Sequence, residues 1–326
     1  MIRKATFFVE DKVYLGNEIF NLNNKKLNRD NCLMPGVLLK EKFLKLGFDL
    51  ATQDLNPLSS SDFALYSDIP NNHNFENSNS YLIIWESEVI LKRNWDKKNY
   101  IFFKKVFTWN DDLVDNNFFF KINIPHHLNK EKIIAKTSFC CLVAGNKTSN
   151  HPNELYSKRR EVIKWFKEVK PNLLNLYGPN WDRIIFKNRY LNFISFKLNL
   201  KFRNKIYKGL IENKTKYLGK YKFSICFENA KNYPGYITEK IFDCFCSNVL
   251  PVYLGPPNTL DYLPENCFID YNKFNSVDSL CEYLQNMTDE THSEYLENIN
   301  HFLNSESIKQ FSIDNFISTI IKNIEI

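Results

Sequence analysis

The sequence predicts an α/β protein made of two domains. Its 326 residues suit two domains of roughly 150 residues each. Between residues 221 and 255, an apolar run, a Pro-Gly break, a helical stripe and a second apolar run follow one another in the order of a βαβ unit. Short apolar runs typical of strands recur in the first half. The polar run Asn129–Lys132 predicts a boundary, so we assign residues 1–136 to the first domain and 137–326 to the second.

The βαβ unit of residues 221–255 carries the clearest local signals. Phe223–Phe227 is expected to form its first strand, and Pro234-Gly235 breaks the chain before the helix. Thr238 is suited to cap that helix, and Val249–Leu254 is expected to be a buried parallel strand. The loop after the first strand therefore leads into a helix N-terminus at the carboxyl end of a sheet. Open α/β sheets bind phosphorylated ligands at such places.

A lysine near the start of this helix strengthens the prediction of an anion site. Lys240 would add a full positive charge to the partial charge of the N-terminal N–H groups, and together they would suit a diphosphate. No Asp-x-Asp triplet, the usual carboxylate signature for a metal-bound nucleotide diphosphate, occurs in the chain. We therefore expect protein cations to neutralise such a ligand, and we expect no metal cofactor.

The first half is expected to place a carboxylate at the end of a strand. Tyr81–Glu86 is apolar and ends at Glu86, the kind of position where catalysis is common in such sheets. From the residues alone, a solvated loop carboxylate is the alternative. Asp111, Asp112 and Asp115 could hold a metal ion, but we interpret them as a turn with solvated carboxylates.

The remaining expected elements follow from apolar periodicity. Further strands are expected at Ala5–Val9, Phe63–Tyr66, Phe102–Thr108, Lys121–Ile124 and Phe139–Ala144. Helices are expected at Val37–Leu46, from Glu154 onward, and around Val277–Asn286, Thr291–Leu303 and Ile313–Ile324. The aliphatic stripe of the last helix is expected to pack on the protein rather than on lipid.

Four blocks of sequence, in order over about fifty residues, resemble the family 10 glycosyltransferases, the α-1,3/α-1,4-fucosyltransferases. The blocks are Phe227–Asn229, Gly235–Asp243, Pro251–Gly255 and Cys267–Asp270. The resemblance implies a GT-B fold, in which two Rossmann-like domains face each other across a cleft. It also implies inverting transfer of L-fucose from GDP-fucose to a hydroxyl of a glycan acceptor, with α-1,3 linkage to N-acetylglucosamine or glucose of a lactosamine-like or surface polysaccharide unit.

The same resemblance assigns roles to individual residues. Trp85–Ile90 is similar to the family's Glu-Ser-Pro stretch, so Glu86 would be the catalytic base; Glu88 stands where the family often has proline and is the alternative base. The donor GDP-fucose would be held by Asn229, Tyr236, Glu239, Lys240, Arg159 and Arg183. From the residues alone, Tyr236 could equally be a packed loop aromatic, Glu239 a first-turn carboxylate and Arg159 a surface arginine.

Two other functions remain open at this point. One is a transferase of the same fold that uses another nucleotide sugar. The other is a catalytically silent module that binds glycan or nucleic acid, because residues 197–222 are strongly basic, with Arg203 among their cations. A solvated basic connection beside an anionic pocket is the simpler interpretation of this stretch, so we expect no nucleic-acid partner.

Composition and charge point to an ordinary globular protein in a reducing compartment. The net charge of +6 fits an anionic substrate or an anionic membrane surface. No apolar run approaches the roughly twenty residues that span a bilayer, and charged residues 10–12 interrupt any signal-peptide core. We therefore expect a cytoplasmic protein with peripheral contact to the membrane. Its eight cysteines are expected to be reduced and mostly buried.

Overall fold

The computed structural model describes residues 2–71, 75, 77–186, 188–202, 204–211 and 213–325. Internal contacts divide the chain into two compact units. Unit 1 comprises Met1–His127, Tyr233–Tyr236 and Ile308–Ile326, and unit 2 comprises Leu128–Asn232 and Ile237–Ser307. The chain thus enters unit 1 three times, once with only a four-residue loop.

Unit 1 is built on a six-stranded parallel sheet in the order β2-β1-β3-β4-β5-β6. The strands are β1 (Arg3–Phe8), β2 (Phe48–Thr52), β3 (Phe63–Ser67), β4 (Ser80–Ile83), β5 (Lys105–Thr108) and β6 (Phe119–Lys121). Its α-helices are α1 (Met34–Lys45) and α8 (Ile313–Asn323). Short 3-10 segments occur at Lys12–Tyr14, Glu18–Phe20, Arg29–Asn31, Leu58–Ser60, Lys92–Trp95 and Lys97–Phe102.

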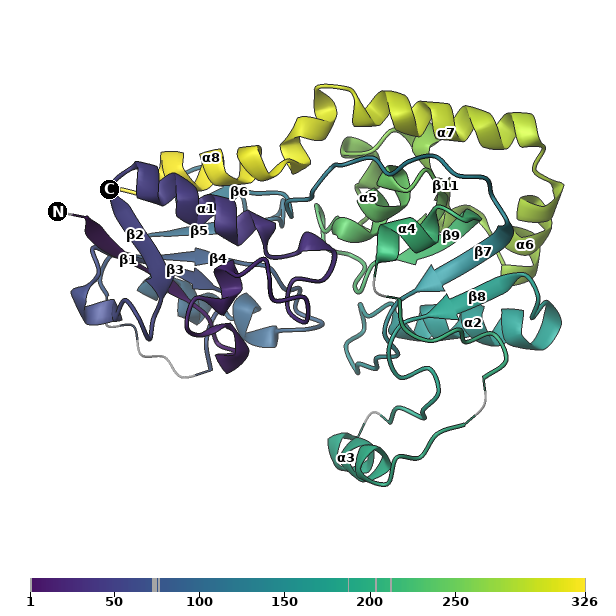
Figure 1. Ribbon diagram of the computed structural model, residues 1–326, viewed down its shortest axis with the longest axis horizontal. Helices are drawn as coiled ribbons and strands as arrows, with labels where there is room; N and C mark the ends of the chain where they lie inside the picture. The colour runs from purple at the N-terminus through teal and green to yellow at the C-terminus, as the bar shows by residue number, and fades with distance from the viewer. Residues whose placement is uncertain are drawn as a thin grey trace. The chain divides into compact units, whose positions relative to one another are not determined.

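The last helix of the chain covers the same face of the unit 1 sheet as α1 (Figure 1). Phe316, Ile317 and Ile320 of α8 are buried in one core cluster with Leu39 and Phe43 of α1. The expected aliphatic stripe is therefore present and packs on protein. The sequence-based boundary assigned this helix to the domain of residues 137–326, whereas its contacts group it with the first strands of the chain. The stripe shows that the helix is half buried, but it carries no information about which sheet the helix covers.

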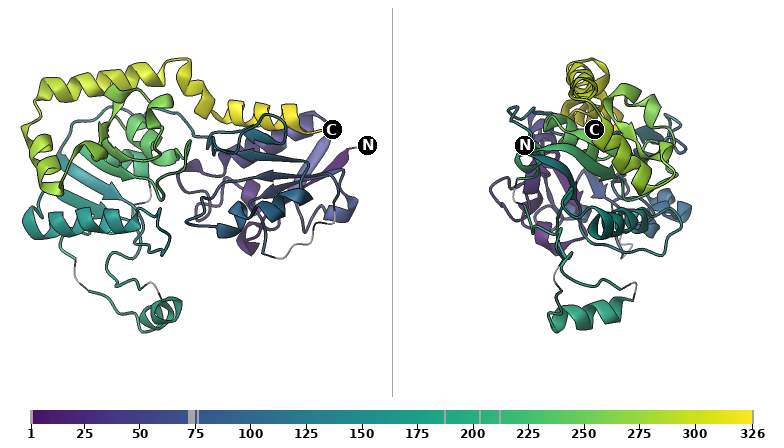
Figure 2. Two further views of the ribbon diagram at one scale, coloured as in Figure 1. Left: turned by 180° about the vertical axis from the view of Figure 1, so that it is seen from behind. Right: turned by 90° about the vertical axis from the view of Figure 1, so that its right-hand side faces the viewer.

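Unit 2 contains a five-stranded parallel sheet in the order β11-β10-β9-β7-β8 (Figure 2). The strands are β7 (Ser138–Val143), β8 (Leu174–Tyr177), β9 (Tyr221–Phe227), β10 (Leu250–Leu254) and β11 (Ile269–Asp270). The helices are α2 (Tyr156–Val169), α3 (Arg189–Lys197), α4 (Lys214–Leu218), α5 (Glu239–Cys246), α6 (Val277–Asn286) and α7 (Asp289–Leu303). Short 3-10 segments lie at Thr259–Asp261, Glu265–Cys267 and Tyr271–Lys273, and Ser307–Phe311 precedes α8.

The strand order of unit 2 places a topological switch point between β7 and β9. The chain moves outward from β7 to β8, then returns to the other side of β7 and continues through β9, β10 and β11. Ligands of doubly wound sheets bind where the winding reverses, beyond the carboxyl ends of the two central strands. In unit 2 these ends are Val143 and Phe227.

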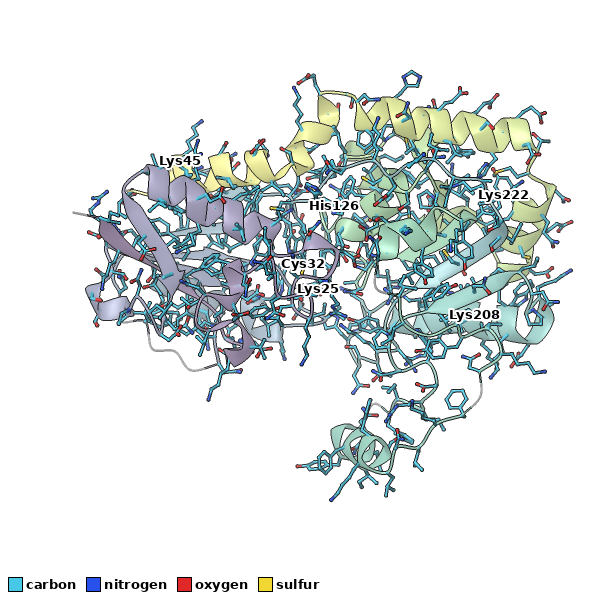
Figure 3. The ribbon with its side chains drawn as sticks, viewed as in Figure 1. Lys25, Cys32, Lys45, His126, Lys208 and Lys222 are labelled. Atoms are coloured by element: carbon cyan, nitrogen blue, oxygen red, sulfur yellow. The ribbon has the colours of Figure 1, made fainter. Side chains whose placement is uncertain are left out.

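All eight cysteines are free thiols, and seven of them are buried. The exposed one is Cys32, which is labelled in Figure 3. Burial raises the pKa of the Cys140 and Cys141 thiols on β7. A thiol in apolar surroundings is a poor nucleophile because its thiolate form is disfavoured. The buried cysteines therefore act as small apolar core residues.

A buried histidine should make the stability of unit 2 depend on pH. The imidazole of His292 in α7 is buried, with Nε2 3.1 Å from the carbonyl oxygen of Lys222, and burial lowers its pKa below 6.5. Below pH 6.5 the unfolded chain therefore binds a proton that the folded chain resists, so the free energy of unfolding should fall as the pH decreases. His292→Gln should flatten this dependence in urea unfolding between about pH 5 and about pH 8. The exposed His301 on the same helix offers the control: His301→Gln should leave the wild-type slope unchanged, and an equal effect of both substitutions would contradict the assignment.

Candidate functional site

A buried carboxylate, Glu228, organises the carboxyl end of β9. The residue is 0% exposed and directly follows the last residue of the strand. Its Oε1 accepts hydrogen bonds from the backbone N–H of Thr238 (2.9 Å) and from the hydroxyl of Tyr253 (3.1 Å). Its Oε2 accepts from the hydroxyl of Thr238 (2.7 Å) and from Nζ of Lys240 (3.0 Å). A buried charge is tolerated only when it is paired and hydrogen-bonded, and four donors meet this requirement.

The expected helix begins where the sequence predicts, but its capping threonine is used differently. Thr238 occupies the N-cap position of α5 without a side-chain capping bond, because its hydroxyl donates to Glu228. The same hydroxyl oxygen accepts a bond from Nζ of Lys240 at 2.7 Å. Burial alone would lower the pKa of Lys240, but the carboxylates of Glu228 and Glu239 outweigh this effect and raise it. The two carboxylates therefore favour the charged form of Lys240.

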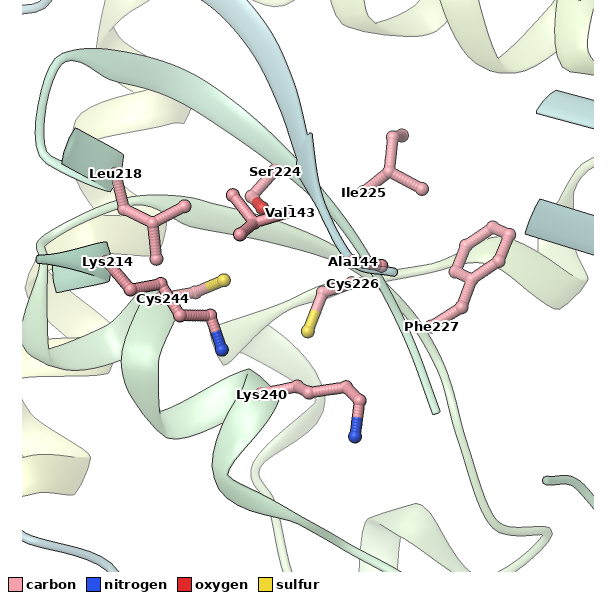
Figure 4. A pocket seen from close by; sticks show the side chains of 10 residues that line it. All are labelled: Val143, Ala144, Lys214, Leu218, Ser224, Ile225, Cys226, Phe227, Lys240 and Cys244. Carbon is pink, nitrogen blue, oxygen red and sulfur yellow. The ribbon is translucent and has the colours of Figure 1, made fainter. Parts of the chain in front are cut away.

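Two lysines line a cavity at the switch point of the unit 2 sheet (Figure 4). The side chain of Lys240 enters this space from α5 and that of Lys214 from α4, and Val143, Ala144, Cys226 and Phe227 of the β7 and β9 ends form its floor. The remaining lining residues are Leu218, Ser224, Ile225 and Cys244, and the cavity itself has a volume of ≈ 20 Å³. Two ammonium groups beside a helix N-terminus favour an anionic ligand.

Lys214 is fixed by an acidic partner on the next helix. Its ammonium donates to the carboxylate of Asp243, which is itself almost completely buried. Burial alone would lower the pKa of Lys214, but Asp243, followed by Glu239, raises it. Because Asp243 and Lys240 both belong to α5, the Lys214–Asp243 ion pair links α4 to the helix that carries Lys240.

Arg159 is buried rather than on the surface. Its Nη2 donates to the carbonyl oxygens of Phe227 (2.8 Å) and Glu228 (2.9 Å), and it lies 3.3 Å from Oδ1 of Asn229. The guanidinium thus links α2 to the carboxyl end of β9 and orients the side chain of Asn229.

Glu239, unlike the buried Glu228 and Arg159, is exposed over 48% of its side chain. Its Oε1 lies 3.7 Å from Nζ of Lys240.

In unit 1, Glu86 lies in a turn that the half-buried Asp68 holds in place. β4 ends at Ile83, earlier than the sequence predicts, and the chain then turns. Oδ1 of Asp68 accepts from the backbone N–H groups of Trp85 (2.7 Å) and Glu86 (3.3 Å) and from Nδ2 of Asn94 (2.7 Å). Burial raises the pKa of Asp68, although these hydrogen bonds oppose the rise. The carbonyl oxygen of Glu86 also accepts from Nδ2 of Asn94 and Nε1 of Trp95.

Glu88, the alternative base, is bonded to the loop Tyr233–Tyr236, which groups with unit 1. The hydroxyl of Tyr233 donates to Oε2 of Glu88 at 3.0 Å. Tyr236 is buried, and its ring centroid lies 4.5 Å from that of Trp109. The structure therefore places Tyr236 with this loop, and Asn229, Glu239 and Lys240 with the unit 2 cluster.

A glycine is required for this loop to pack. Gly235 has φ +81°, and a Cβ atom there would lie 2.3 Å from the carbonyl oxygen of Trp109 and 2.6 Å from Nζ of Lys121. Lys121 in turn forms an ion pair of 2.6 Å with Asp111. Asp115 accepts backbone bonds from residues 117–119. Asp111 and Asp115 thus have the structural roles expected of a turn.

Arg183 contacts the segment around α3. Its Nη2 donates to Oδ1 of Asn199 at 2.6 Å, and the guanidinium carbon lies 4.9 Å from the ring centroid of Phe196. It is not among the residues that line the Lys240 cavity. Arg203 of the basic stretch lies outside the described residues.

Sequence reasoning did not assign a role to Glu228, Lys214 or Asp68. The sequence position of Glu228 could have marked it as a site residue, because it is a carboxylate directly after an apolar strand. The same criterion was applied to Glu86. Lys214 is one of many lysines in a basic stretch, and Asp68 follows a short strand without a motif, so neither could be singled out.

Comparison with known proteins bears on unit 2 directly. Residues 170–315 match the model of the glycosyltransferase family 10 (fucosyltransferase) C-terminal domain. This range contains Glu228, Lys240 and the paired Lys214. Residues 170–315 are therefore similar to the C-terminal domain of the family 10 fucosyltransferases.

Proteins similar to this chain include bacterial and animal fucosyltransferases. It is 29% identical to an α-(1,3)-fucosyltransferase of Helicobacter pylori over 152 residues, which are 41% of this chain and 31% of that protein. It is 31% identical to a 4-galactosyl-N-acetylglucosaminide 3-α-L-fucosyltransferase of Homo sapiens over 150 residues, 45% of this chain and 38% of that protein. The match thus spans about a third of the length of these relatives.

Solved structures show the fold of this chain. An α1,3-fucosyltransferase crystallised with GDP-fucose aligns with a TM-score of 0.54 at 16% identity, covering 99% of this chain and 90% of that one. A DNA-modifying β-glucosyltransferase aligns with a TM-score of 0.58 at 11% identity, covering 99% and 100%. The predicted GT-B fold of two Rossmann-like, parallel-sheet domains is confirmed.

The Glu228 cluster is expected to contribute to the stability of unit 2. In Glu228→Gln an amide N–H₂ group replaces one carboxylate oxygen, so at least one buried donor loses its acceptor. We expect the free energy of unfolding to fall by about 2 kcal/mol, measured by urea denaturation. Tyr253→Phe removes a single donor and should cost about 1 kcal/mol. A Glu228→Gln protein as stable as the wild type would contradict a structural role for this carboxylate.

Proposed function

We propose that this chain is an inverting fucosyltransferase that moves L-fucose from GDP-fucose to a hydroxyl group of a glycan acceptor. The observation that carries the proposal is the position of Lys240 and Lys214 beside the start of α5, at the switch point of unit 2 and within the family 10 match. An anion site of this kind suits the diphosphate of a nucleotide sugar. The names of the relatives support fucose as the transferred sugar.

In the proposed reaction, Glu86 removes the proton from an acceptor hydroxyl while that oxygen attacks the anomeric carbon of fucose. The bond from this carbon to the β-phosphate oxygen breaks on the opposite face, and GDP leaves with the electron pair. Negative charge grows on the diphosphate as the bond breaks. Lys240 and the first turn of α5 stabilise that charge in the transition state.

The remaining donor contacts follow from where each side chain lies. The exposed carboxylate of Glu239 holds fucose hydroxyls, and Asn229, oriented by Arg159, offers its amide to ribose or phosphate. For Tyr236 and Arg183 a donor contact is proposed from the resemblance to the family, because neither lines the Lys240 cavity. Because lysines neutralise the diphosphate, the reaction proceeds without a divalent metal, and a chelator should leave turnover unchanged. For the acceptor, we propose α-1,3 linkage to N-acetylglucosamine or glucose.

The test is incubation of the purified protein with GDP-fucose and a panel of galactose- and N-acetylglucosamine-containing acceptors. We expect release of GDP together with a fucosylated product whose linkage is read by NMR. Thermal-shift comparison of GDP, UDP and CMP should show stabilisation by GDP alone. Stabilisation by UDP instead would favour another nucleotide sugar, and acceptor binding without consumption of GDP-fucose would favour a catalytically silent module.

A further inference from the structure

The helix α3 and the chain after it expose many large apolar side chains. We use the name α3 segment for residues 188–202 and 204–211. Within it Tyr190 is 81% exposed, and Phe193, Ile194, Leu198 and Leu210 are at least half exposed. In Figures 1 and 2, α3 stands away from the sheet of unit 2. Exposed apolar side chains concentrated in one segment mark an interaction surface.

The orientation of α3 is the reverse of that expected for a helix of a globular domain. The amide of Asn192 exchanges two hydrogen bonds with the backbone of Phe186 (2.7 and 2.6 Å), and Ser195 is buried. Both lie on the face turned toward the protein. Positions 190, 193, 194 and 198 have the spacing of the opposite face and are exposed. A helix normally turns its apolar side to the core, so the outward side of α3 is shaped for a partner.

The charge of the α3 segment shows what kind of partner fits. Lys197, Lys205 and Lys208 are exposed, as is Lys201, which forms an ion pair of 3.0 Å with Asp182. The sequence contains no Asp or Glu from residue 183 to residue 211. Lys208 is labelled in Figure 3. Aromatic and aliphatic side chains interspersed with lysines, without acidic residues, are the pattern of helices that lie in the interface of an anionic bilayer.

We propose that the α3 segment binds the surface of anionic phospholipid membranes. The aromatic rings and the aliphatic side chains enter the boundary between headgroups and acyl chains, and the lysines pair with lipid phosphates. Within the ranges that the structure describes, no helix has the length and hydropathy that crossing a bilayer requires. In this proposal the α3 segment lies on the membrane surface. The proposal does not depend on the proposed transfer reaction.

Two other partners fit the same segment less well. A nucleic acid would pair with the lysines and stack on the aromatic rings, but it would gain little from Ile194, Leu198 and Leu210. A second copy of the chain would cover the apolar side chains, but it would bring two basic segments together, and like charges repel. An anionic bilayer satisfies both the apolar and the basic side chains.

The test is cosedimentation of the full chain with vesicles of phosphatidylcholine alone and of phosphatidylcholine with about 30% phosphatidylglycerol. We expect binding to the anionic vesicles to be at least about tenfold tighter than to the neutral ones, and to weaken as salt is raised. Phe193→Ser combined with Ile194→Ser should lower the affinity for anionic vesicles about tenfold or more. Lys205→Glu combined with Lys208→Glu should remove the preference for the anionic vesicles.

A matched pair of leucines provides the control. Leu198 is 62% exposed in the α3 segment, and Leu260 is 61% exposed elsewhere in unit 2. Leu198→Ser should weaken vesicle binding, whereas Leu260→Ser should not, and both proteins should keep the wild-type unfolding temperature. Equal binding to both vesicle types would overturn the proposal. The proposal would also be overturned if the Phe193/Ile194 double substitution left vesicle binding intact and instead abolished RNA binding, or abolished self-association measured by sedimentation velocity.

Discussion

Replacing Lys240 with alanine should slow fucose transfer by about 10²–10³-fold, because a preorganised cation is lost where charge develops on the departing diphosphate. The protein should stay folded. Glu228 keeps three of its four donors, two from Thr238 and one from Tyr253. The measurement is GDP release with saturating GDP-fucose and acceptor, together with urea unfolding of the same preparation.

A surface lysine of the same unit serves as the control for this substitution. Lys222 on β9 forms an ion pair with Asp289, whose side chain is 84% exposed (Figure 3). Lys222→Ala should leave turnover close to that of the wild type, since exposed ion pairs contribute little. If Lys240→Ala retained most of the wild-type turnover, the anion site would have to lie elsewhere in unit 2. If Lys240→Ala strongly lowered the free energy of unfolding, and the loss of turnover only followed from the unfolded fraction, Lys240 would have a structural role only.

Replacing Glu86 with glutamine should lower the rate of fucose transfer by about 10³-fold. The affinity for GDP should stay unchanged. The amide cannot accept the proton of the acceptor hydroxyl. It preserves the size of the side chain, and the hydrogen bonds that position this turn use the backbone atoms of Glu86. Turnover is measured as GDP release, and GDP affinity by calorimetry.

Glu88→Gln separates the two candidate bases. Glu88 accepts a hydrogen bond from Tyr233, and glutamine keeps an oxygen that can accept it, so a loss of less than about tenfold is expected. If Glu88→Gln abolished transfer while Glu86→Gln retained it, the base would have been assigned to the wrong carboxylate. The exposed Glu41 on α1 provides a neutral comparison, because Glu41→Gln should change neither measurement.

The elements that were predicted well are those whose signals are local. The βαβ unit from β9 to β10 follows from an apolar run, a Pro-Gly break and a helical stripe, all within about ten residues of one another. α6 covers the predicted range Val277–Asn286, because its apolar spacing is readable without knowledge of any partner. The position of Thr238 at the start of α5 was predicted for the same reason.

The features that were missed depend on contacts between distant residues. β2 is a short strand that contains Asp49 and is recognisable only through its pairing with β1. In the candidate site, Lys214 and Asp243 are 29 residues apart, and Tyr253 and Glu228 are 25 apart. No local pattern reports such pairs. Their chemistry became visible only when the sheet brought α4, α5 and β10 together.

The distribution of the cysteines gives this molecule a built-in attachment point. Cys32 is the exposed thiol, whereas the other seven lie inside the two units. A maleimide dye added to the folded protein should therefore modify unit 1 at a single position and leave the sheet of unit 2, with Cys140, Cys141 and Cys226, unlabelled. Fluorescence from that position would report on the surroundings of unit 1 in the native protein without any engineered substitution.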